Sequence, residues 1–250
     1  MSEPLILIPA RMASTRLPGK PLADIHGVPM IVHVWRRAVE ARAGRVAVAA
    51  AEPEIAAAVA QAGGESILTR PDHPSGSDRV FEAVTKLDPQ ARHDVIVNLQ
   101  GDLPTLDPAL VKAVIEPMAD AAVDLATLVT EIHEPSERTN PNVVKAVLAL
   151  EAKGTQGRAL YFTRAQAPWG EGPLFHHIGI YAWRRAALER FVALPPSTLE
   201  KREKLEQLRA LEAGMKVAAR VVDAVPLGVD TPQDLERARA MLDPKGRKQK

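Results

Sequence analysis

The stretch "IPARMASTRLPGKPL", residues 8–22, has the residue types of a phosphate-binding loop. Arg11, Arg16 and Lys20 follow one another closely there, among prolines that oppose a regular helix. Gly19 allows the backbone to approach a ligand, so amide groups and cationic side chains can converge on one small volume. This combination favours triphosphate binding, although an ordinary basic surface loop has the same composition. The stretch has neither the Walker A pattern nor the Gly-x-Gly-x-x-Gly dinucleotide pattern.

Two acidic residues are candidates for holding a divalent cation beside such a phosphate. Asp102 follows the break at Gly101 in "VNLQGDLP", and Asp230 precedes "TPQDLERARAML". Thr231 is the natural cap of that helix, which leaves Asp230 without an evident structural role. Mg²⁺ is usually held by one or two carboxylates together with phosphate oxygens and water, so two aspartates suffice if the fold brings them together. Spacing does not show that they meet, and each is also an ordinary turn residue.

Alternating apolar runs and helical patterns indicate how these residues are positioned. We expect strands at 4–8, 45–50, 65–69 and 94–99, separated by helices with apolar residues at three-four spacing. Strands that are apolar on both faces and separated by helices are typical of an α/β fold with a mostly parallel central sheet. Ligands of such sheets bind at the carboxyl ends of the strands. The polar loops after Ile8, Thr69 and Leu99 all leave such ends.

The pattern changes near residue 125, after which β-rich segments replace the alternation. The segments "DLATLVTEI", "VVKAVLAL" and "HHIGIYAW" predict strands, followed by a charged helix at 199–212, a strand at 216–222 and a helix capped by Thr231. We therefore expect a nucleotide-binding α/β core at 1–125, a β-rich insertion at 126–204 and a completion of the core at 205–242. Residues 243–250 form a basic tail that we expect to be disordered.

The composition excludes several classes of function. The 250 residues carry 32 basic and 31 acidic side chains and a net charge of +1, so the broad positive charge of a nucleic-acid binder is absent. There is no cysteine, which excludes disulfides, thiolate metal sites and cysteine nucleophiles. No stretch is long and apolar enough to span a membrane, and the first residues lack a signal-peptide pattern, so we expect a cytoplasmic protein.

Eight motifs together resemble the 3-deoxy-manno-octulosonate (Kdo) cytidylyltransferase family. In order, they are "IPARMASTRLPGKPL", "HPSGSDR", "VNLQGD", "NPNVVK", "YFTRAQAPW", "HHIGIYAWR", "LEQLR" and "GVDTPQDLERAR". The resemblance covers residues 4–242. The first motif is shared with CMP-sialic acid synthetases and related sugar nucleotidyltransferases, whereas "YFTRAQAPW", "HHIGIY" and "LEQLR" are more specific to this family.

The resemblance implies a Rossmann-like nucleotidyltransferase fold, with helices on both faces of the sheet. We expect the β-rich insertion at 126–204 to serve sugar binding and, because its apolar β segments exceed what one small sheet needs, dimer contact. The implied reaction transfers CMP from CTP to the anomeric hydroxyl of Kdo, giving CMP-Kdo and pyrophosphate for lipopolysaccharide biosynthesis. The implied cofactor is Mg²⁺, and the implied assembly is a homodimer. From the charge balance and the lack of a long apolar stretch, we expect no nucleic-acid or membrane partner.

The same resemblance assigns roles to individual residues. The nucleotide would contact Pro9, Ala10, Arg11, Ser14, Arg16, Lys20, Ser75, Gly76, Ser77, Arg79 and Gln100. Asp102 and Asp230 would hold the metal and, with Lys20, carry the catalytic charge. The sugar would contact Arg164, His177, Tyr181, Glu206 and Gln207. Without the resemblance, His177 reads as a buried structural histidine, and Glu206 and Gln207 read as part of a solvated helix face.

The chain departs from the family pattern in two places. Relatives commonly have Thr-Asp after the second strand, where this chain has Ala50 and Ala51 followed by Glu52, so we expect any polar contact there to be missing or supplied differently. The family sequence "QGDEP" is here "QGDLP", in which Leu103 removes a carboxylate close to the expected metal.

Other functions remain open at this point. The nearest alternatives are a CMP-sialic acid synthetase and a cytidylyltransferase for an amino-substituted Kdo. A different class is a non-catalytic nucleotide-binding regulator, against which the presence of both Asp102 and Asp230 argues. A dinucleotide-dependent oxidoreductase is disfavoured because no Gly-x-Gly pattern follows an expected strand.

Overall fold

The computed structural model describes residues 2–14, 16–152 and 154–243. These residues form two compact units. The first unit contains residues 2–111 and 226–243, and the second unit contains residues 112–225. Helix α4 (Ala109–Ile115) includes the point at which the chain leaves the first unit. All but the first residue of the expected basic tail, 243–250, lies outside the described residues.

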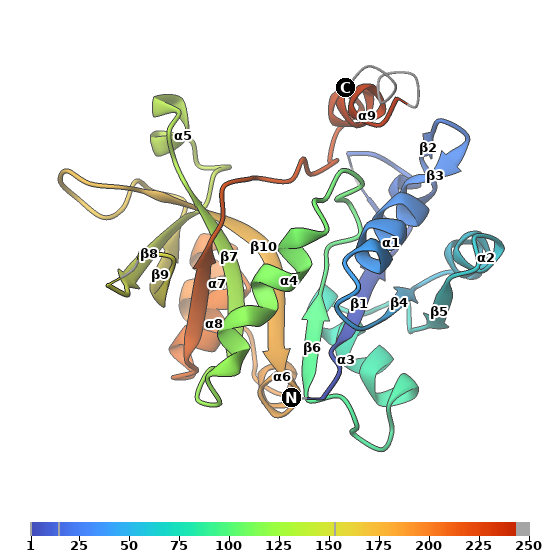
Figure 1. Cartoon of the computed structure of the whole chain (residues 1–250), viewed down its shortest axis with the longest axis horizontal. Helices are drawn as coiled ribbons and strands as arrows, with labels where there is room; N and C mark the ends of the chain where they lie inside the picture. Colours follow the sequence, from blue (N-terminus) through green and yellow to red (C-terminus); the bar gives the residue numbers. More distant parts are fainter. Residues whose placement is uncertain (1, 15, 153, 244–250) are drawn as a thin grey trace. The chain divides into compact units, whose positions relative to one another are not determined.

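A parallel sheet is the framework of the first unit (Figure 1). Its strands lie in the order β5-β4-β1-β6, and each neighbouring pair is parallel. Their bounds are Leu5–Ala10 for β1, Arg45–Ala50 for β4, Glu65–Leu68 for β5 and Val95–Asn98 for β6. Leu5 to Ile8 are completely buried because β1 is covered on both faces. The strands predicted from the apolar runs are therefore confirmed.

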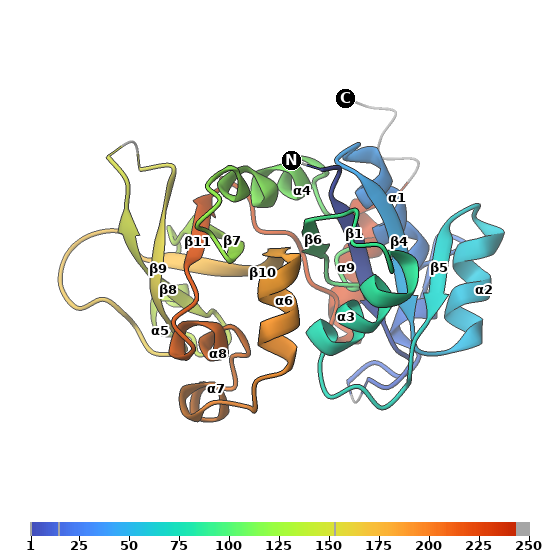
Figure 2. The same cartoon turned by 90° about the horizontal axis from the view of Figure 1, so that it is seen from below.

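Helices cover both faces of this sheet (Figures 1 and 2). They are α1 (Met30–Glu40), α2 (Pro53–Gln61) and α3 (Gly76–Leu87). Helices α1 and α2 carry the chain outward from β1 to β4 and β5, whereas α3 returns it to β6. Because such crossovers are right-handed, α3 lies on the face opposite α1 and α2. The loops after β1, β5 and β6 consequently open at one edge of the sheet.

Helix α9 (Pro232–Met241) returns the C-terminal segment to the first unit. Its start is a capping box, in which Thr231 Oγ1 accepts from the Asp234 amide at 3.2 Å and the Asp234 carboxylate accepts from the Thr231 amide at 3.0 Å. One apolar cluster joins this segment to the loop region after β1; its buried members are Ile25, Met30, Val229, Leu235, Ala238 and Leu242. After η1 (Lys20–Leu22), Ile25 lies in β2 (Asp24–Ile25), and Met30 begins α1 directly after β3 (Val28–Pro29). The predicted cap at Thr231 is confirmed, and Asp230 lies in the loop before it.

The second unit is built on a mixed sheet. Its strands lie in the order β10-β7-β11-β9-β8, with β11 parallel to β7, the other neighbouring pairs antiparallel, and a further pairing of β10 with β8. The strands are β7 (Leu125–Glu131), β8 (Lys145–Leu150), β9 (Gln156–Thr163), β10 (Phe175–Arg184) and β11 (Val217–Val221). The helical segments are η2 (Glu116–Ala119), α5 (Pro135–Thr139), α6 (Arg185–Val192), α7 (Thr198–Glu203) and α8 (Gln207–Glu212).

The structure corrects the expected helix at 199–212. It is two helices, α7 and α8, because Lys204 takes a left-handed conformation with φ 56° and ends the first of them. The compact units also divide the chain at 111/112 and 225/226, whereas the sequence suggested 125/126 and 204/205. Pairing of β11 with β7 and β9 places residues 205–225 with the second unit.

No helix in the described part of the chain is long and apolar enough to cross a membrane.

The cap of α9 should contribute measurably to stability. Thr231→Ala removes the side-chain acceptor for the Asp234 amide, so we expect the free energy of unfolding to fall by about 1 kcal/mol. Urea denaturation followed by circular dichroism measures this loss. The matched control is Thr85→Ala, an exposed threonine inside α3, which should change the stability by less than about 0.5 kcal/mol. Equal stability of Thr231→Ala and the unchanged protein would contradict the assignment of the cap.

Candidate active site

The loop after β1 folds back on itself before it reaches Lys20. The Gly19 amide donates to the Met12 carbonyl at 3.4 Å, and the Leu17 amide donates to Ser14 Oγ at 3.4 Å. Gly19 has φ 68°, a left-handed conformation that glycine adopts without strain. Lys20 then begins the short 3-10 helix η1, which ends at Leu22. Pro9 and Ala10, near the start of the stretch 8–22, still belong to β1, so the irregular loop begins at Arg11.

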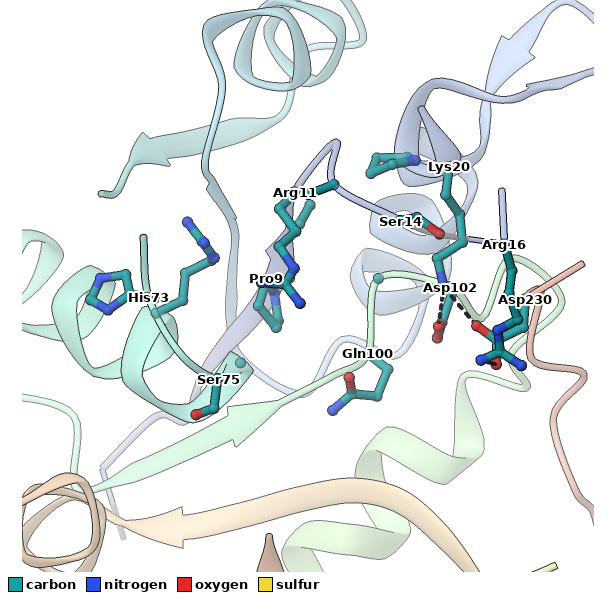
Figure 3. A pocket seen from close by; sticks show the side chains of 16 residues that line it. Pro9, Arg11, Ser14, Arg16, Lys20, His73, Ser75, Gln100, Asp102 and Asp230 are labelled. Atoms are coloured by element: carbon teal, nitrogen blue, oxygen red, sulfur yellow. Dashed lines mark hydrogen bonds and ion pairs between the residues drawn. The ribbon is translucent and has the colours of Figure 1, made fainter. Parts of the chain in front are cut away.

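Lys20 joins the two predicted metal ligands (Figure 3). Its Nζ lies 2.7 Å from Asp102 Oδ2 and 3.0 Å from Asp230 Oδ1. Burial alone would lower the pKa of Lys20, but the charges and hydrogen bonds of both aspartates outweigh it and hold that pKa above its usual value. Two carboxylates that are more than a hundred residues apart in the chain thus meet at one ammonium group.

Arg16 adds a second cation at Asp230. Its Nη2 lies 3.0 Å from Asp230 Oδ2, in an exposed position where solvent weakens the pair. Arg16, Lys20 and the aspartates therefore form one charged cluster at the edge of the sheet (Figure 3).

The backbone fixes where the two aspartates lie. A Cβ at Gly101 would stand 2.8 Å from the Pro9 carbonyl oxygen, so the turn before Asp102 crosses the end of β1 too closely for a side chain. The Val229 amide donates to the Asp102 carbonyl at 3.0 Å, which ties the C-terminal segment to the same turn and places Asp230 next to it. Three remote segments are thereby held together by backbone contacts.

A cavity of about 380 Å³ opens beside this cluster (Figure 3). Every residue that the family resemblance assigns to the nucleotide lines it except Ser77, which is buried in α3. Its lining is Pro9, Ala10, Arg11, Ala13, Ser14, Arg16, Lys20, Pro21, His73, Ser75, Gly76, Arg79, Gln100, Gly101, Asp102 and Asp230. Of these, Ala13, Pro21, His73 and Gly101 were not predicted. His73 is the first residue of the motif "HPSGSDR", and its place in that motif could have identified it as a site residue.

The start of α3 forms one wall of the cavity. Ser75 caps the helix: its Oγ accepts from the Asp78 amide at 3.3 Å and donates to Asp78 Oδ2 at 2.7 Å. Arg79 is 2% exposed and donates to Thr69 Oγ1 at 2.7 Å and to the Arg70 carbonyl at 2.8 Å. Its guanidinium group therefore supports the loop after β5, and burial lowers the pKa of Arg79.

Glu82 holds that loop from the next turn of α3. Its carboxylate accepts from His73 Nε2, from the Arg70 amide at 3.0 Å and from Lys86 Nζ, which lies 2.7 Å away. Burial alone would raise the pKa of Glu82, but these donors outweigh it and lower that pKa to about 2. Glu82 therefore stays charged at neutral pH and fixes one ring nitrogen of His73 at the cavity wall.

The first departure from the family pattern has a structural replacement. Glu52 Oε2 accepts from the Met12 amide at 3.0 Å, so a carboxylate after β4 anchors the loop after β1. Ala50 and Ala51 are buried and have no polar side-chain atom, so Glu52 is the residue after β4 that contacts the loop. At the second departure, Leu103 is buried. Its Cδ2 lies 4.0 Å from the position that a Cβ of residue 228, a glycine, would occupy. A buried apolar side chain thus takes the place of the missing carboxylate.

The residues assigned to the sugar lie in the second unit, and three of them are in contact. His177 Nδ1 lies 3.4 Å from Gln207 Nε2, and the His177 ring centroid lies 5.7 Å from that of Tyr181. Burial lowers the pKa of His177 to about 3 and raises that of Tyr181 far above its usual value, so both groups are uncharged. Gln207 is 5% exposed, which corrects the alternative that it belongs to a solvated helix face. Glu206 is partly buried, with Arg209 Nη2 3.9 Å from its carboxylate.

Arg164 has a different environment in the same unit. It follows β9, and its side chain donates to the Glu203 carbonyl at 2.8 Å and to the Pro141 carbonyl at 2.9 Å, while its amide donates to Glu203 Oε2 at 2.9 Å. It thereby joins the end of α7 to the motif "NPNVVK". Among the described residues, no hydrogen bond joins Arg164 to His177, Tyr181 or Gln207.

The carboxylate pair fits a hard cation that keeps other ligands. Within the described ranges there is no cluster of three or more histidine, aspartate or glutamate side chains that could hold a metal alone. Asp102 and Asp230 supply oxygen donors around one cation-sized position, as their shared contact with Lys20 shows. Two carboxylates plus phosphate oxygens and water match the coordination of Mg²⁺.

Comparison with solved structures supports the fold. The chain superimposes on a structure described as "CMP:2-keto-3-deoxy-manno-octonic acid synthetase complexed with CTP" with a TM-score of 0.89 and 40% identity, over 98% of this chain and 100% of the other. A cytidylyltransferase from Leptospira borgpetersenii gives a TM-score of 0.61 at 17% identity, which supports the fold alone. The predicted Rossmann-like nucleotidyltransferase fold is confirmed.

Comparison of sequences gives the family. A family model described as "Cytidylyltransferase" matches residues 5–217. The 3-deoxy-manno-octulosonate cytidylyltransferase of Rhodospirillum centenum is 67% identical over 243 residues, which cover 97% of this chain and 95% of the relative. The protein of that name from Parvibaculum lavamentivorans is 68% identical over 240 residues, or 96% and 93% of the two chains. With such identity over nearly its whole length, the chain belongs to the 3-deoxy-manno-octulosonate cytidylyltransferase family.

Proposed function

We propose that the protein transfers CMP from CTP to the anomeric hydroxyl of Kdo and releases pyrophosphate, with Mg²⁺ held by Asp102 and Asp230. The observation that carries this proposal is the contact of Lys20 with both carboxylates, at the wall of a cavity lined by the loop after β1. Because CTP is supplied in the cytoplasm, we place the reaction there and assign its product to lipopolysaccharide assembly.

The chemistry requires two anions to approach each other. The anomeric hydroxyl of the sugar acid loses its proton to solvent as its oxygen attacks the α-phosphorus of CTP. The bond from that phosphorus to the bridging oxygen breaks, and pyrophosphate leaves with its electron pair. Arg11, Arg16 and Lys20 lie at the cavity and would bind the triphosphate charge. A cation about 4 Å from a phosphate charge contributes roughly 4 kcal/mol at an effective dielectric constant near 20, before desolvation. These residues can therefore offset the repulsion, and no covalent enzyme intermediate is needed.

A Mg²⁺ ion bound at Asp102 and Asp230 would polarise the α-phosphate and neutralise charge on the departing pyrophosphate. Backbone amides and one side chain would add to the positioning of the nucleotide. Gly76 lies at the cavity in the first turn of α3, where amide groups without helical partners can bind a polar ligand atom. Gln100 presents a carboxamide that can read the edge of a base.

Two alternatives use the same nucleotide site. A CMP-sialic acid synthetase or an amino-Kdo cytidylyltransferase would differ in the second unit, where the sugar-assigned residues lie. A non-catalytic nucleotide-binding regulator would bind CTP without releasing pyrophosphate. The intact pair of aspartates favours the enzyme.

The substrates can be identified by a pyrophosphate-release assay that crosses four nucleoside triphosphates with Kdo, amino-Kdo and sialic acid. We expect CTP with Kdo to give the highest kcat/KM, at least about tenfold above any other pair, because one site must fit both the base and the sugar acid. Sialic acid turning over faster than Kdo would transfer the assignment to that alternative. CTP binding without pyrophosphate release from any pair would support the regulator.

Loss of either metal-binding carboxylate should remove most of the activity. We expect Asp102→Asn and Asp230→Asn to lower kcat/KM by about 100-fold or more and to weaken binding of Mn²⁺, used as a spectroscopic probe with CTP present. Asp223→Asn, the same change on an exposed loop, is the control and should leave both measurements unaltered. Normal turnover of Asp102→Asn at saturating Mg²⁺ would remove Asp102 from the metal site.

Exposed apolar side chains in the second unit support a homodimer. Leu150 ends β8, Leu160 lies in β9, and Trp169 in the following loop is 100% exposed. We expect sedimentation velocity to give twice the mass of one chain, because pairing of two subunits would cover these exposed apolar side chains. Leu160→Lys should produce monomers, whereas Val39→Lys, a change of an exposed valine in α1, should not. A monomer at all concentrations would reject the dimer.

A further inference from the structure

Thr127 lies at the start of a buried chain of hydrogen bonds in the second unit. This threonine of β7 is completely buried. Its Oγ1 lies 3.0 Å from His177 Nε2, 3.1 Å from the Ile178 carbonyl oxygen and 2.9 Å from the Ile180 carbonyl oxygen. His177 in turn contacts Gln207 through its other ring nitrogen.

A β-bulge explains why one hydroxyl meets two carbonyls. The pairing of β10 with β7 shifts between Ile178 and Tyr181, so that Ile178 lies opposite Leu128 and Tyr181 lies opposite Thr127. The extra residues, Gly179 and Ile180, have no partner on β7 in the register. The bulge therefore turns backbone acceptors toward the threonine side chain.

The two carbonyls fix the direction of every bond in this chain. A carbonyl oxygen only accepts, so the Thr127 hydroxyl is the donor toward Ile178 or Ile180. Donation to His177 instead would leave the Thr127 oxygen 3.1 and 2.9 Å from two carbonyl oxygens with no proton between them, which is the less favourable arrangement. With its proton directed to a carbonyl, the Thr127 oxygen has only lone pairs left for His177, and His177 Nε2 must carry the proton and donate. An uncharged imidazole has one N–H, so Nδ1 is the acceptor.

The same argument continues to Gln207. Only the amide nitrogen of its carboxamide can donate to a bare Nδ1, and Nε2 is the atom that lies 3.4 Å away. The carboxamide oxygen is thereby left over; it has no hydrogen-bond partner within the part of the chain that the structure describes. Burial, which lowers the pKa of His177 to about 3, keeps this arrangement neutral under ordinary conditions.

We infer that Thr127 is a positioning residue that holds His177 as the Nε2–H tautomer and so turns the carboxamide oxygen of Gln207 toward the ligand, where it accepts a hydrogen bond from a sugar hydroxyl. The inference rests on the proposed function for its ligand, since the resemblance assigns His177 and Gln207 to the sugar. With its oxygen facing the ligand, Gln207 accepts hydrogen bonds only from donor groups such as sugar hydroxyls. A carboxylate of the sugar acid would be repelled by the same oxygen and must bind elsewhere.

Replacing the hydroxyl by a methyl group tests the inference. In Thr127→Val the Nε2–H tautomer loses its acceptor, so His177 shifts to the Nδ1–H form, and Gln207 must rotate its carboxamide to accept. We expect KM for Kdo to rise about tenfold or more, while KM for CTP stays within about twofold. The ¹⁵N signals of His177 should show Nε2–H in the unchanged protein and Nδ1–H in the variant.

Two further variants separate positioning from general structure. Thr127→Ser keeps the hydroxyl and should restore both the tautomer and KM for Kdo. Thr130→Val makes the same hydroxyl-to-methyl change three residues along β7, which places it on the other face of the strand, and should alter neither.

Three outcomes would overturn the inference. The first is an Nδ1–H signal from His177 in the unchanged protein, a measurement that holds even if Thr127→Val does not fold. The second is an unaltered KM for Kdo in a folded Thr127→Val. The third is an equal rise of KM for CTP, which would indicate a general distortion. If Kdo is no substrate at all, the proposed function fails, yet the tautomer measurement still decides whether the Thr127 chain of bonds exists.

Discussion

The contact of Lys20 with Asp102 and Asp230 is the constraint on which the first unit depends. Two carboxylates repel each other. They remain close only where a cation contacts both of them and backbone contacts hold their segments in place. The backbone condition is met by the tight crossing at Gly101 and by the bond from the Val229 amide to the Asp102 carbonyl. The α/β fold matters because it delivers all three charges to one edge of a sheet.

Local patterns predicted most of the first unit, because its strands and caps are determined by neighbours in the sequence. The apolar runs gave β1 and β4, and Thr231 gave the start of α9. The sequence also placed Asp230 in a loop with no capping role, which is why it was a candidate ligand. The meeting of Asp230 with Asp102 could not be predicted from spacing, since it depends on a backbone hydrogen bond between segments more than a hundred residues apart.

The second unit was less predictable, because its geometry depends on irregular backbone. The break at Lys204 separates α7 from α8 although the charge pattern of 199–212 is continuous. Strand β9 lies between the segments "VVKAVLAL" and "HHIGIYAW", which predicted strands, and was not among the strands expected from the sequence. Thr127 carries no sequence signal at all, because a threonine inside an apolar strand is ordinary and its importance arises from the bulge in the neighbouring strand.

We propose that the two units recognise their ligands by different physical means. In the first, the charges of Lys20, Asp102, Asp230 and their neighbours would be matched to a triphosphate and a metal, so affinity there depends on electrostatics and falls with added salt. In the second, His177 and Tyr181 are kept neutral by burial, and the direction of each hydrogen bond is fixed by acceptors that cannot reverse. A charged site alone would bind any polyanion. A series of uncharged hydrogen-bonding groups with fixed donors and acceptors would instead distinguish a hydroxyl from a carboxylate. Discrimination among sugar acids is therefore expected to originate in the second unit, even though the proposed binding of CTP is driven by the charges of the first.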